Sequence, residues 1–375
     1  MKAVVTGLDE ALVRDVVRPV APVASVYLGP PPPEALSTVV RDIDLRAQSL
    51  LRRLREAGAA RATVAAVEQF LAGQPPKPVE MAIFAAGDEV SHVVPVPGAG
   101  TADLAMFGAP AHAVPVLAWL QRRPAYVSVV ADRAGADITV VPRGSVEGHT
   151  SVVEGPDDEI ERNAPGGWSQ PRYQRRAEDS WQHNAARVAE ATAAALRQVG
   201  AGLLVVSGDV RAVHLLLDLL PNGVRKEATI RQVTGSRHED GSRAERLAAT
   251  ARAVEEYAAA QTQAVLTRFV ESRAPGGYAV EGAAPTLRAL AGSRVATLLV
   301  APVPDDDRLA CFGAEAAEVS HPDETTLLAG LDLRTGPLVD VAVRAALLTD
   351  ATVCVLDPAT PGRPAEDIGA LCRFR

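Results

Sequence analysis

The strongest constraint on the fold is the alternation of short β-branched runs with longer amphipathic segments along the chain. Residues 125–144, AYVSVVADRAGADITVVPRG, contain two β-branched runs joined by a short turn with a glycine, a pattern typical of a β-hairpin. Residues 170–199 and 242–272 instead carry apolar side chains at helical spacing. Strands that alternate with helices in this way predict a mixed α/β protein.

The chain length and the positions of two proline-containing segments predict three domains. The 375 residues exceed the roughly 100–200 residues of an ordinary single domain. We place one boundary near Pro124, at the end of PVLAWLQRRP, and another at the Pro-Gly-Gly sequence that begins at Pro275. The predicted domains are an amino-terminal α/β domain (1–123), a middle domain (124–275) and a compact carboxy-terminal α/β domain (276–375).

Charge and cysteine usage narrow the class of protein. The formal net charge of −8 means that any nucleic-acid contact must come from a local basic patch. No apolar run is long enough to span a membrane, and the start carries acids where a signal peptide is basic, so we expect a cytoplasmic protein. The three cysteines lack CxxC spacing and are expected to be reduced and buried; they are Cys311, Cys354 and Cys372.

The sequence from Gly166 to Glu190, GGWSQPRYQRRAEDSWQHNAARVAE, combines the features of an RNA-binding loop and helix. Paired glycines let a loop tip approach RNA closely, and the serine that follows is suited to cap a helix whose free amides favour phosphate. Three arginines at i, i+3 and i+4 share one helix face, and two aromatic rings are interleaved with them, which suits phosphate pairing and base stacking. The predicted RNA-binding residues are Gly166, Gly167, Trp168, Ser169, Arg172, Tyr173, Arg175, Arg176 and His183.

Each of these features also has an ordinary structural interpretation. The string APGG occurs twice, at 164–167 and 274–277, and is typical of a turn. Arg175 and Asp179 have the spacing of a common helix-surface ion pair. His183 is as well suited to packing against a sheet as to contacting RNA.

Other motifs predict no active site and no cofactor. Asp209 follows the apolar strand GLLVVSG, where a single aspartate is usually a helix cap. Gly98 and Gly100 lack the third glycine of a dinucleotide fingerprint, and no Walker A string is present. No converging set of carboxylates or CxxC pair indicates a metal.

The segment from Gly166 to Glu190 resembles the loop and helix of archaeal and eukaryotic class-I release factors and Pelota, which read GGQSxxRFxR before a helix containing H…VAE. The same string stands here without a gap, and the nearest resemblance is to the bacterial branch of that family, which includes ribosome hibernation factors. The resemblance implies a ribonuclease-H-like middle domain and a carboxy-terminal α/β/α domain like the kink-turn-binding ribosomal proteins.

The departures from the release-factor pattern predict that the protein is not an enzyme. Trp168 stands where those factors have the glutamine that helps to order the attacking water, and an indole offers one donor and no acceptor. The codon-reading strings are absent too, because the first asparagine is Asn163 and the first cysteine is Cys311, too late for the NIKS and YxCxxxF motifs.

The resemblance implies a monomer that occupies the ribosomal A site without regard to codon, under stress or in storage. Its 166–169 tip would lie near the peptidyl-transferase centre, on large-subunit ribosomal RNA, and elongation factor Tu would be its GTPase partner. The alternatives are a rescue factor or peptidyl-tRNA hydrolase, a nuclease, and a stress protein that binds another RNA or protein.

Overall fold

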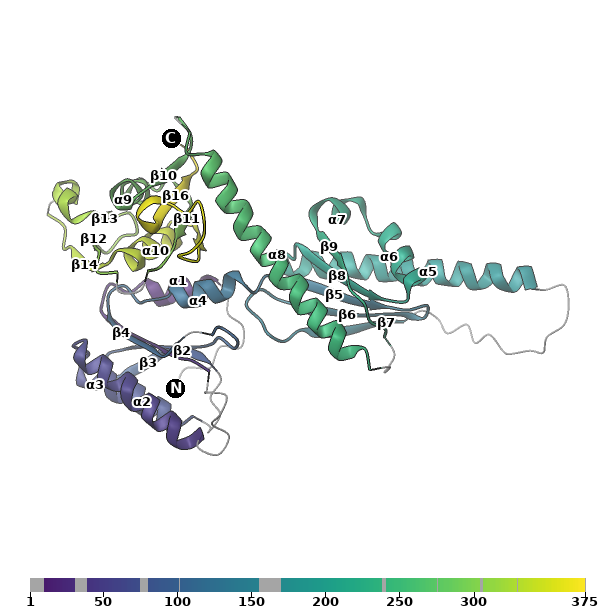
Figure 1. The fold of residues 1–375 in the computed structure, drawn as a ribbon, viewed down its shortest axis with the longest axis horizontal. Coiled ribbons are helices and arrows are strands. Elements are labelled where there is room, and N and C mark those ends of the chain that lie inside the picture. The colour runs from purple at the N-terminus through teal and green to yellow at the C-terminus, as the bar shows by residue number, and fades with distance from the viewer. Residues whose placement is uncertain are drawn as a thin grey trace. The chain divides into compact units, whose positions relative to one another are not determined.

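The structure is a computed structural model, and the parts of the chain that it describes form two compact units (Figure 1). Unit 1 comprises Met1–Gln121 and Gln261–Arg375, and unit 2 comprises Arg122–Ala260. The described backbone covers residues 10–30, 39–74, 80–100, 102–154, 170–237, 241–274, 276–303, 306–328 and 330–374. Side chains are described for the same residues except 39–43, 170–180 and 326–327.

The amino-terminal part of unit 1 is a four-stranded antiparallel sheet, in the order β3-β2-β1-β4, between two pairs of helices. Its central strand is buried on both faces, as expected for the apolar run VASVYL. Val26 and Leu28 pack with α2 and α3, whereas Val23 and Tyr27 join the core that contains α1 and α4. The elements are α1 (Glu10–Val17), β1 (Val23–Leu28), α2 (Val39–Glu56), α3 (Arg61–Ala72), β2 (Met81–Ala86), β3 (Glu89–Pro95), β4 (Leu104–Gly108) and α4 (Val114–Gln121).

The carboxy-terminal part of unit 1 is a mixed sheet with the order β10-β16-β11-β15 and a smaller sheet with the order β13-β12-β14. Strands β11 and β15 are parallel, and β16 is antiparallel to both of its neighbours. The elements are β10 (Ala279–Glu281), α9 (Ala283–Ala291), β11 (Val295–Val300), β12 (Leu309–Phe312), β13 (Val319–Ser320), η1 (Pro322–Leu328), β14 (Arg334–Pro337), α10 (Leu338–Leu348), β15 (Thr352–Val355), η2 (Ala365–Asp367) and β16 (Ile368–Cys372).

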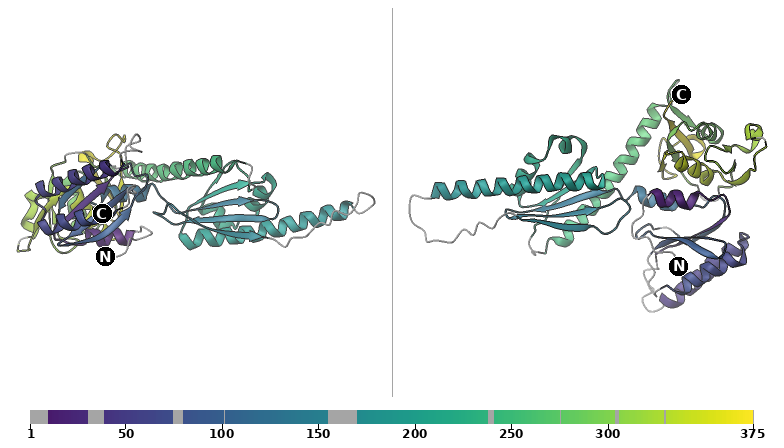
Figure 2. Two further views of the ribbon diagram at one scale, coloured as in Figure 1. Left: turned by 90° about the horizontal axis from the view of Figure 1, so that it is seen from below. Right: turned by 180° about the vertical axis from the view of Figure 1, so that it is seen from behind.

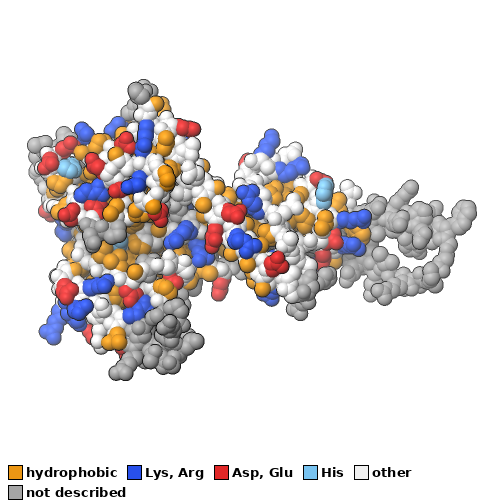
Figure 3. Space-filling view, in the orientation of Figure 1, with side chains coloured by type: hydrophobic (Ala, Val, Ile, Leu, Met, Phe, Trp, Pro, Cys, Tyr) orange, Lys and Arg blue, Asp and Glu red, His pale blue; other side chains and the backbone are white. Residues whose placement is uncertain are grey.

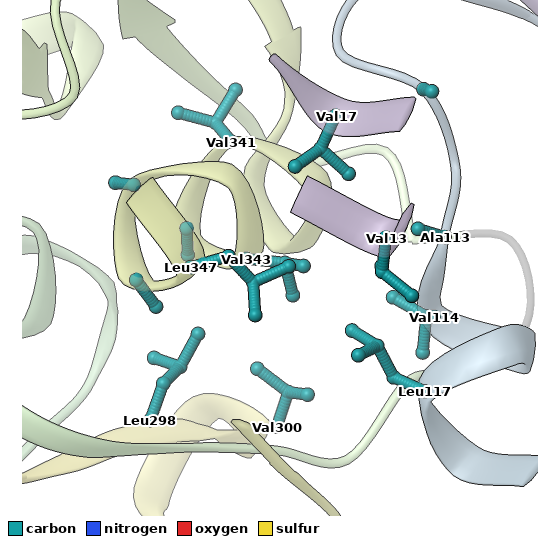
Figure 4. Packing of buried hydrophobic residues seen from close by; sticks show 14 of the residues in the cluster. Val13, Val17, Ala113, Val114, Leu117, Leu298, Val300, Val341, Val343 and Leu347 are labelled. Carbon is teal, nitrogen blue, oxygen red and sulfur yellow. The ribbon is translucent and has the colours of Figure 1, made fainter. Parts of the chain in front are cut away.

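One hydrophobic core joins these two distant parts of the sequence. Val13 of α1 and Leu117 of α4 lie in the same cluster as Val300 of β11 and Val343 of α10 (Figure 4). A polar contact adds to it, since His112 Nδ1 and the buried Asp340 Oδ1 lie 2.9 Å apart. The predicted ranges 1–123 and 276–375 therefore share one core.

Unit 2 is a five-stranded sheet in the order β7-β6-β5-β8-β9, with helices on both faces (Figure 2). Strands β5, β6 and β7 are antiparallel, whereas β5, β8 and β9 are parallel. Helices α5 and α6 cover one face and α8 covers the other. The elements are β5 (Tyr126–Ala131), β6 (Gly135–Val141), β7 (His149–Glu154), α5 (Gln170–Val199), β8 (Leu203–Gly208), α6 (Val210–Leu219), α7 (Asn222–Glu227), β9 (Thr229–Gln232) and α8 (Arg243–Glu271).

The predicted α/β class is confirmed, and so are the hairpin β5–β6 and the long helices α5 and α8. The division by contacts falls at 121/122 and, within α8, at 260/261. The predicted end of the middle domain, at 275, lies just beyond the end of α8. The three functional ranges remain a prediction.

Two apolar residues in helices are exposed, and one cysteine that was expected to be buried is not. Leu45 in α2 and Leu247 in α8 are 61% and 58% exposed. Cys311 and Cys354 are free and buried as predicted, whereas Cys372 is only half-buried. Burial raises the pKa of the Cys354 thiol to about 11, so this cysteine behaves as an inert apolar residue.

Candidate RNA-binding site

Helix α5 carries the predicted RNA-binding face, and its carboxy-terminal half anchors it to the sheet. Val188, Ala189 and Leu196 are buried in the unit 2 core, at the spacing of an amphipathic helix. The amino-terminal part of α5 extends past the end of the sheet (Figures 1 and 2).

The predicted site residues fall into three groups in the structure. Residues 166–169, the loop tip, lie outside the described residues. Arg172, Tyr173, Arg175 and Arg176 lie in the first turns of α5, with side chains outside the described set.

His183 is the one site residue whose side chain is described. It is exposed, so the alternative that it packs against the sheet is wrong. On an α-helix, position 183 lies about three turns beyond position 172 on the same face. The arginines of this face are therefore continued by an exposed imidazole.

A half-buried arginine, Arg237, connects the strands that precede the loop in the chain. The guanidinium of Arg237 lies 3.1 Å from Asp132, 2.9 Å from Asp137 and 4.0 Å from Glu154, the last residue of β7. Burial alone would lower the pKa of Arg237, but its hydrogen bond to Asp137 and its pairing with Asp132 raise it. The hairpin β5–β6 and the end of β7 are thus joined by one permanently charged group.

The Ser207-Gly208-Asp209 sequence has a structural role. Asp209 caps α6, since its side chain accepts hydrogen bonds from the backbone N–H groups of Arg211 and Ala212. Gly208 has a φ of +126° and leaves no room for a Cβ atom against the carbonyl of Ala131. The expectation that Asp209 is a helix cap is confirmed.

Two hollows lie at the carboxyl ends of the parallel strands, where α/β sheets commonly bind ligands. A small cavity of about 20 Å³ lies between α5, α6 and the end of β5, and its lining includes Arg133, Trp181 and Arg211. A groove of about 860 Å³ lies by the ends of β8 and β9, and its charged or titratable lining is His214, Asp218 and Glu245. No local sequence pattern predicts either hollow, because the walls of each come from separate elements of the chain.

On the face shown in Figure 3, the described Lys and Arg side chains do not form a second basic surface that would bind a polyanion. Over the described side chains of that face, Lys and Arg are interspersed with Asp and Glu. Among described residues, no group of three or more His, Cys, Asp or Glu side chains is placed to hold a metal ion. None of the described helices is long and apolar enough to cross a bilayer.

Unit 2 thus combines a mixed sheet with a long basic helix, α5, that starts shortly after a Gly-Gly sequence. Residues 125–275 match the profile of Bacterial archaeo-eukaryotic release factor family 2. The resemblance inferred from the sequence is therefore confirmed for this segment, which includes α5 and the sheet of unit 2.

Several solved structures are similar to this chain at low sequence identity and low TM-score. An archaeal translation termination factor is 16% identical over 97% of this chain and 96% of its own, with a TM-score of 0.25. Pelota from Archaeoglobus fulgidus is 15% identical over 79% and 80%, with a TM-score of 0.31. Archaeal Pelota from a ribosome-bound complex is 14% identical over 98% and 93%, with a TM-score of 0.41. No curated protein sequence matches the chain.

Proposed function

We propose that the protein binds the ribosome, occupies the A site independently of the codon and holds idle ribosomes without releasing peptide. The observation that carries this proposal is the release-factor match over 125–275 combined with Trp168 at the position of the catalytic glutamine. The A site, the hibernation role and the absence of catalysis are parts of this proposal.

The part of α5 that extends past the sheet is suited to contact ribosomal RNA. The helix keeps positions 172, 175 and 176 on one face, with exposed His183 further along it. A rigid helix that presents cations on one side suits contact with ribosomal RNA phosphates, and the 166–169 tip precedes it directly in the chain. The tip would then lie near the peptidyl-transferase centre, with Trp168 stacked on a base.

Co-sedimentation with ribosomes tests the binding. Reversing Arg172, Arg175 and Arg176 to Glu should weaken binding and flatten its dependence on salt, by roughly 0.7–0.9 units of log–log slope per lost phosphate contact. Trp168→Ala should weaken binding by about 1–3 kcal/mol with little change in that slope.

Reversal of arginines elsewhere provides the matched control. Arg252 and Arg268 are exposed on α8, and their reversal to Glu should leave ribosome binding unchanged. If the triple variant of α5 folds and still co-sediments as tightly as the original protein, the RNA-binding proposal is wrong.

A peptide-release assay separates the proposal from its rival, a rescue factor or peptidyl-tRNA hydrolase. The match of residues 125–275 to a release factor family favours this rival over the others. Purified protein should release no peptide from ribosomes that carry peptidyl-tRNA, with or without a stop codon, because an indole has no acceptor to position a water. Release at the rate of a genuine release factor would establish the rival instead.

We further propose that the carboxy-terminal range 276–375 binds a translational GTPase, in bacteria elongation factor Tu. A fragment of residues 122–275 retains unit 2 and the matched segment but lacks both that range and residues 1–121. In a pull-down, the full chain should recover the factor and the fragment should not. Equal recovery by both would place the contact in unit 2 instead.

A further inference from the structure

The groove at the carboxyl ends of β8 and β9, which we call the β9 groove, has room for several side chains of another molecule. Its volume is about 860 Å³, within the range of roughly 300–1,000 Å³ that is usual for ligand sites. One wall is α6, another is residues 232–236, and the third is the start of α8. All of these walls belong to unit 2.

The walls of the β9 groove are held together by hydrogen bonds within the protein. The backbone N–H of Val233 donates to the carbonyl oxygen of Val206 in β8 at 2.9 Å. The backbone N–H of Ser236 donates to Ser242 Oγ at 3.1 Å, and Arg246 of α8 donates to the Ser236 carbonyl oxygen. A groove that is formed in advance binds a partner without the entropic cost of ordering its walls.

Apolar side chains of α6 line one side of the groove. Val210, Val213 and Leu217 have the i, i+3 and i+7 spacing of a single helix face. Val213 is buried, whereas Val210, the first residue of α6, is 83% exposed. Val233 adds apolar surface from the segment that follows β9. An apolar side chain of a partner would therefore remove exposed apolar surface from water.

The charged side chains in the lining are acidic. Asp218 of α6 and Glu245 of α8 lie on two different walls, and both are exposed. His214 Nδ1 lies 3.0 Å from Asp218 Oδ2, and no Lys or Arg belongs to the lining. Carboxylates on two walls attract a cationic partner and repel phosphates.

The nearby arginines do not line the groove. Arg211 lines the small cavity beside α5, and Arg246 donates to a backbone carbonyl oxygen. Gln232 lines the groove, and because successive side chains of a strand alternate, Arg231 lies on the opposite face of the sheet. Arg243, in the first turn of α8, is also outside the lining.

We propose that the β9 groove binds a segment of a partner protein that carries Lys or Arg beside apolar side chains. The apolar side chains cover Val210 and Leu217, and the cations lie beside Asp218 and Glu245. The same carboxylates disfavour RNA, whose phosphates they would repel. The net charge of −8 disfavours a second copy of this chain. The proposal adds a protein-binding surface to unit 2 and does not depend on RNA binding by α5.

Fluorescence anisotropy of three short labelled peptides, titrated with the full-length protein, tests the chemistry of the partner. Lys alternates with Leu in the first peptide, Glu replaces Lys in the second, and Ser replaces Leu in the third. We expect the Lys–Leu peptide to bind on the order of tenfold more tightly than the Lys–Ser peptide, because it covers apolar surface. The Glu–Leu peptide should not bind, and the affinity of the Lys–Leu peptide should fall as salt is added.

Variants of exposed residues locate the binding in the groove. Asp218→Asn together with Glu245→Gln should weaken the Lys–Leu peptide by up to about fivefold for each carboxylate and flatten its salt dependence. Glu255→Gln together with Glu256→Gln is the matched control, because both side chains are exposed on α8 outside the groove. The control should leave the affinity unchanged.

A second pair of variants tests the apolar contact. Val210→Ser should weaken the Lys–Leu peptide severalfold and leave the Lys–Ser peptide unchanged, because only the first covers this side chain. Val152→Ser is the matched control, since Val152 is 57% exposed on β7 and outside the groove. Reversal of Arg172, Arg175 and Arg176 to Glu should not weaken peptide binding, which separates this surface from the proposed RNA-binding face.

Three results would overturn the proposal. The first is equal affinity for the Lys–Leu and Glu–Leu peptides, or an affinity for the Lys–Leu peptide that none of the groove variants alters. The second is binding of a labelled U oligonucleotide that weakens with Val210→Ser, which would make the groove a nucleic-acid site. The third is a dimer in sedimentation velocity that Val210→Ser dissociates, which would make the groove an interface between two copies of this chain.

Discussion

Unit 2 is built from one continuous stretch of chain, whereas unit 1 joins two stretches on either side of it. The sheet of unit 2 packs against helices from the same stretch. In unit 1, β1 and α4 share a core with β11 and α10. Because neither half of that core can bury its apolar face alone, the ends of the chain should be mutually dependent for folding. The release-factor-like segment should fold without them.

Truncation should produce the largest difference between the units. A chain of residues 1–275 loses the partners of α1 and α4, including Leu298 and Leu347. Hydrogen exchange should therefore show loss of protection throughout residues 10–121, while a fragment of residues 122–275 keeps its protection and unfolds cooperatively. If residues 10–121 stay protected in the truncated chain, the shared core is not required.

The same truncation cannot be used alone to locate the GTPase contact. It would unfold part of the chain that remains, and so weaken an interaction for an indirect reason. The fragment of residues 122–275 avoids this problem, because unit 2 does not draw on the shared core.

A pair of glycine substitutions should destabilise one unit at a time. Gly336 in β14 lies against the Ala109 carbonyl in unit 1, and Gly208 lies against that of Ala131 in unit 2, with no room for a Cβ atom in either place. Replacement by Ala should cost roughly 2–4 kcal/mol in the affected unit, because backbone must move in each case. Chemical denaturation followed by hydrogen exchange would identify which unit opens.

Two glycines with open surroundings provide controls. Gly108 in unit 1 and Gly223 in unit 2 have no atom within 4 Å of an added Cβ. Their replacement by Ala should change stability much less. Destabilisation of both units by Gly336→Ala or by Gly208→Ala would show that the units unfold together.

The sequence predicted most elements because their apolar spacing is local. Helix α5 was placed at residues 170–199, the bounds that the structure gives. Strand β16, between β10 and β11 in the second sheet of unit 1, was missed, because IGALC is short and follows a run rich in Pro, Gly and charged residues. The helix α3 and the strand β4 were also not identified.

Long-range contacts could not be read from the sequence. Nothing local in the sequence links His112 with Asp340, or Arg133 with Asn184, because these pairs meet only through tertiary packing. For the candidate site, the sequence identified α5 and its basic face but missed the cavity beside it. Trp181 is visible as an aromatic residue of α5, but Arg133 lies in the turn between β5 and β6, so no local pattern indicated their contact.

A half-buried ion pair, Arg46 with Asp103, should make unit 1 sensitive to acid. Arg46 binds both carboxylate oxygens of Asp103 at 2.6 and 2.7 Å, and the backbone N–H of Gly29 donates to the same carboxylate. Burial by itself raises the pKa of Asp103, but the bonds from Arg46 and Gly29 outweigh it and lower the pKa. The carboxylate therefore stabilises the folded state fully above its ordinary pKa of about 3.8, and this contribution is lost as the pH falls through the lowered value.

Asp103→Asn should accordingly cost about 1–3 kcal/mol at neutral pH, as expected for a lost charged hydrogen-bond partner. The difference from the original protein should shrink as the pH falls below about 3.8. Urea denaturation at several pH values, with hydrogen exchange in unit 1, would measure it. A difference that stays constant down to acid pH would show that Asp103 acts through packing and not through its charge.

Removal of the α6 cap should have the smallest effect, and only in unit 2. Asp209 accepts hydrogen bonds from two backbone amides at 3.0 and 3.1 Å, so Asp209→Ala should cost about 1 kcal/mol, the usual value for an N-cap. Asp209→Asn keeps an acceptor and should be nearly neutral. If Asn destabilises unit 2 as much as Ala does, the 3.9 Å pairing of Asp209 with Arg133 matters more than the cap. Thermal denaturation of the two variants decides between these roles, because only the loss of an acceptor should lower the melting temperature if Asp209 acts as a cap.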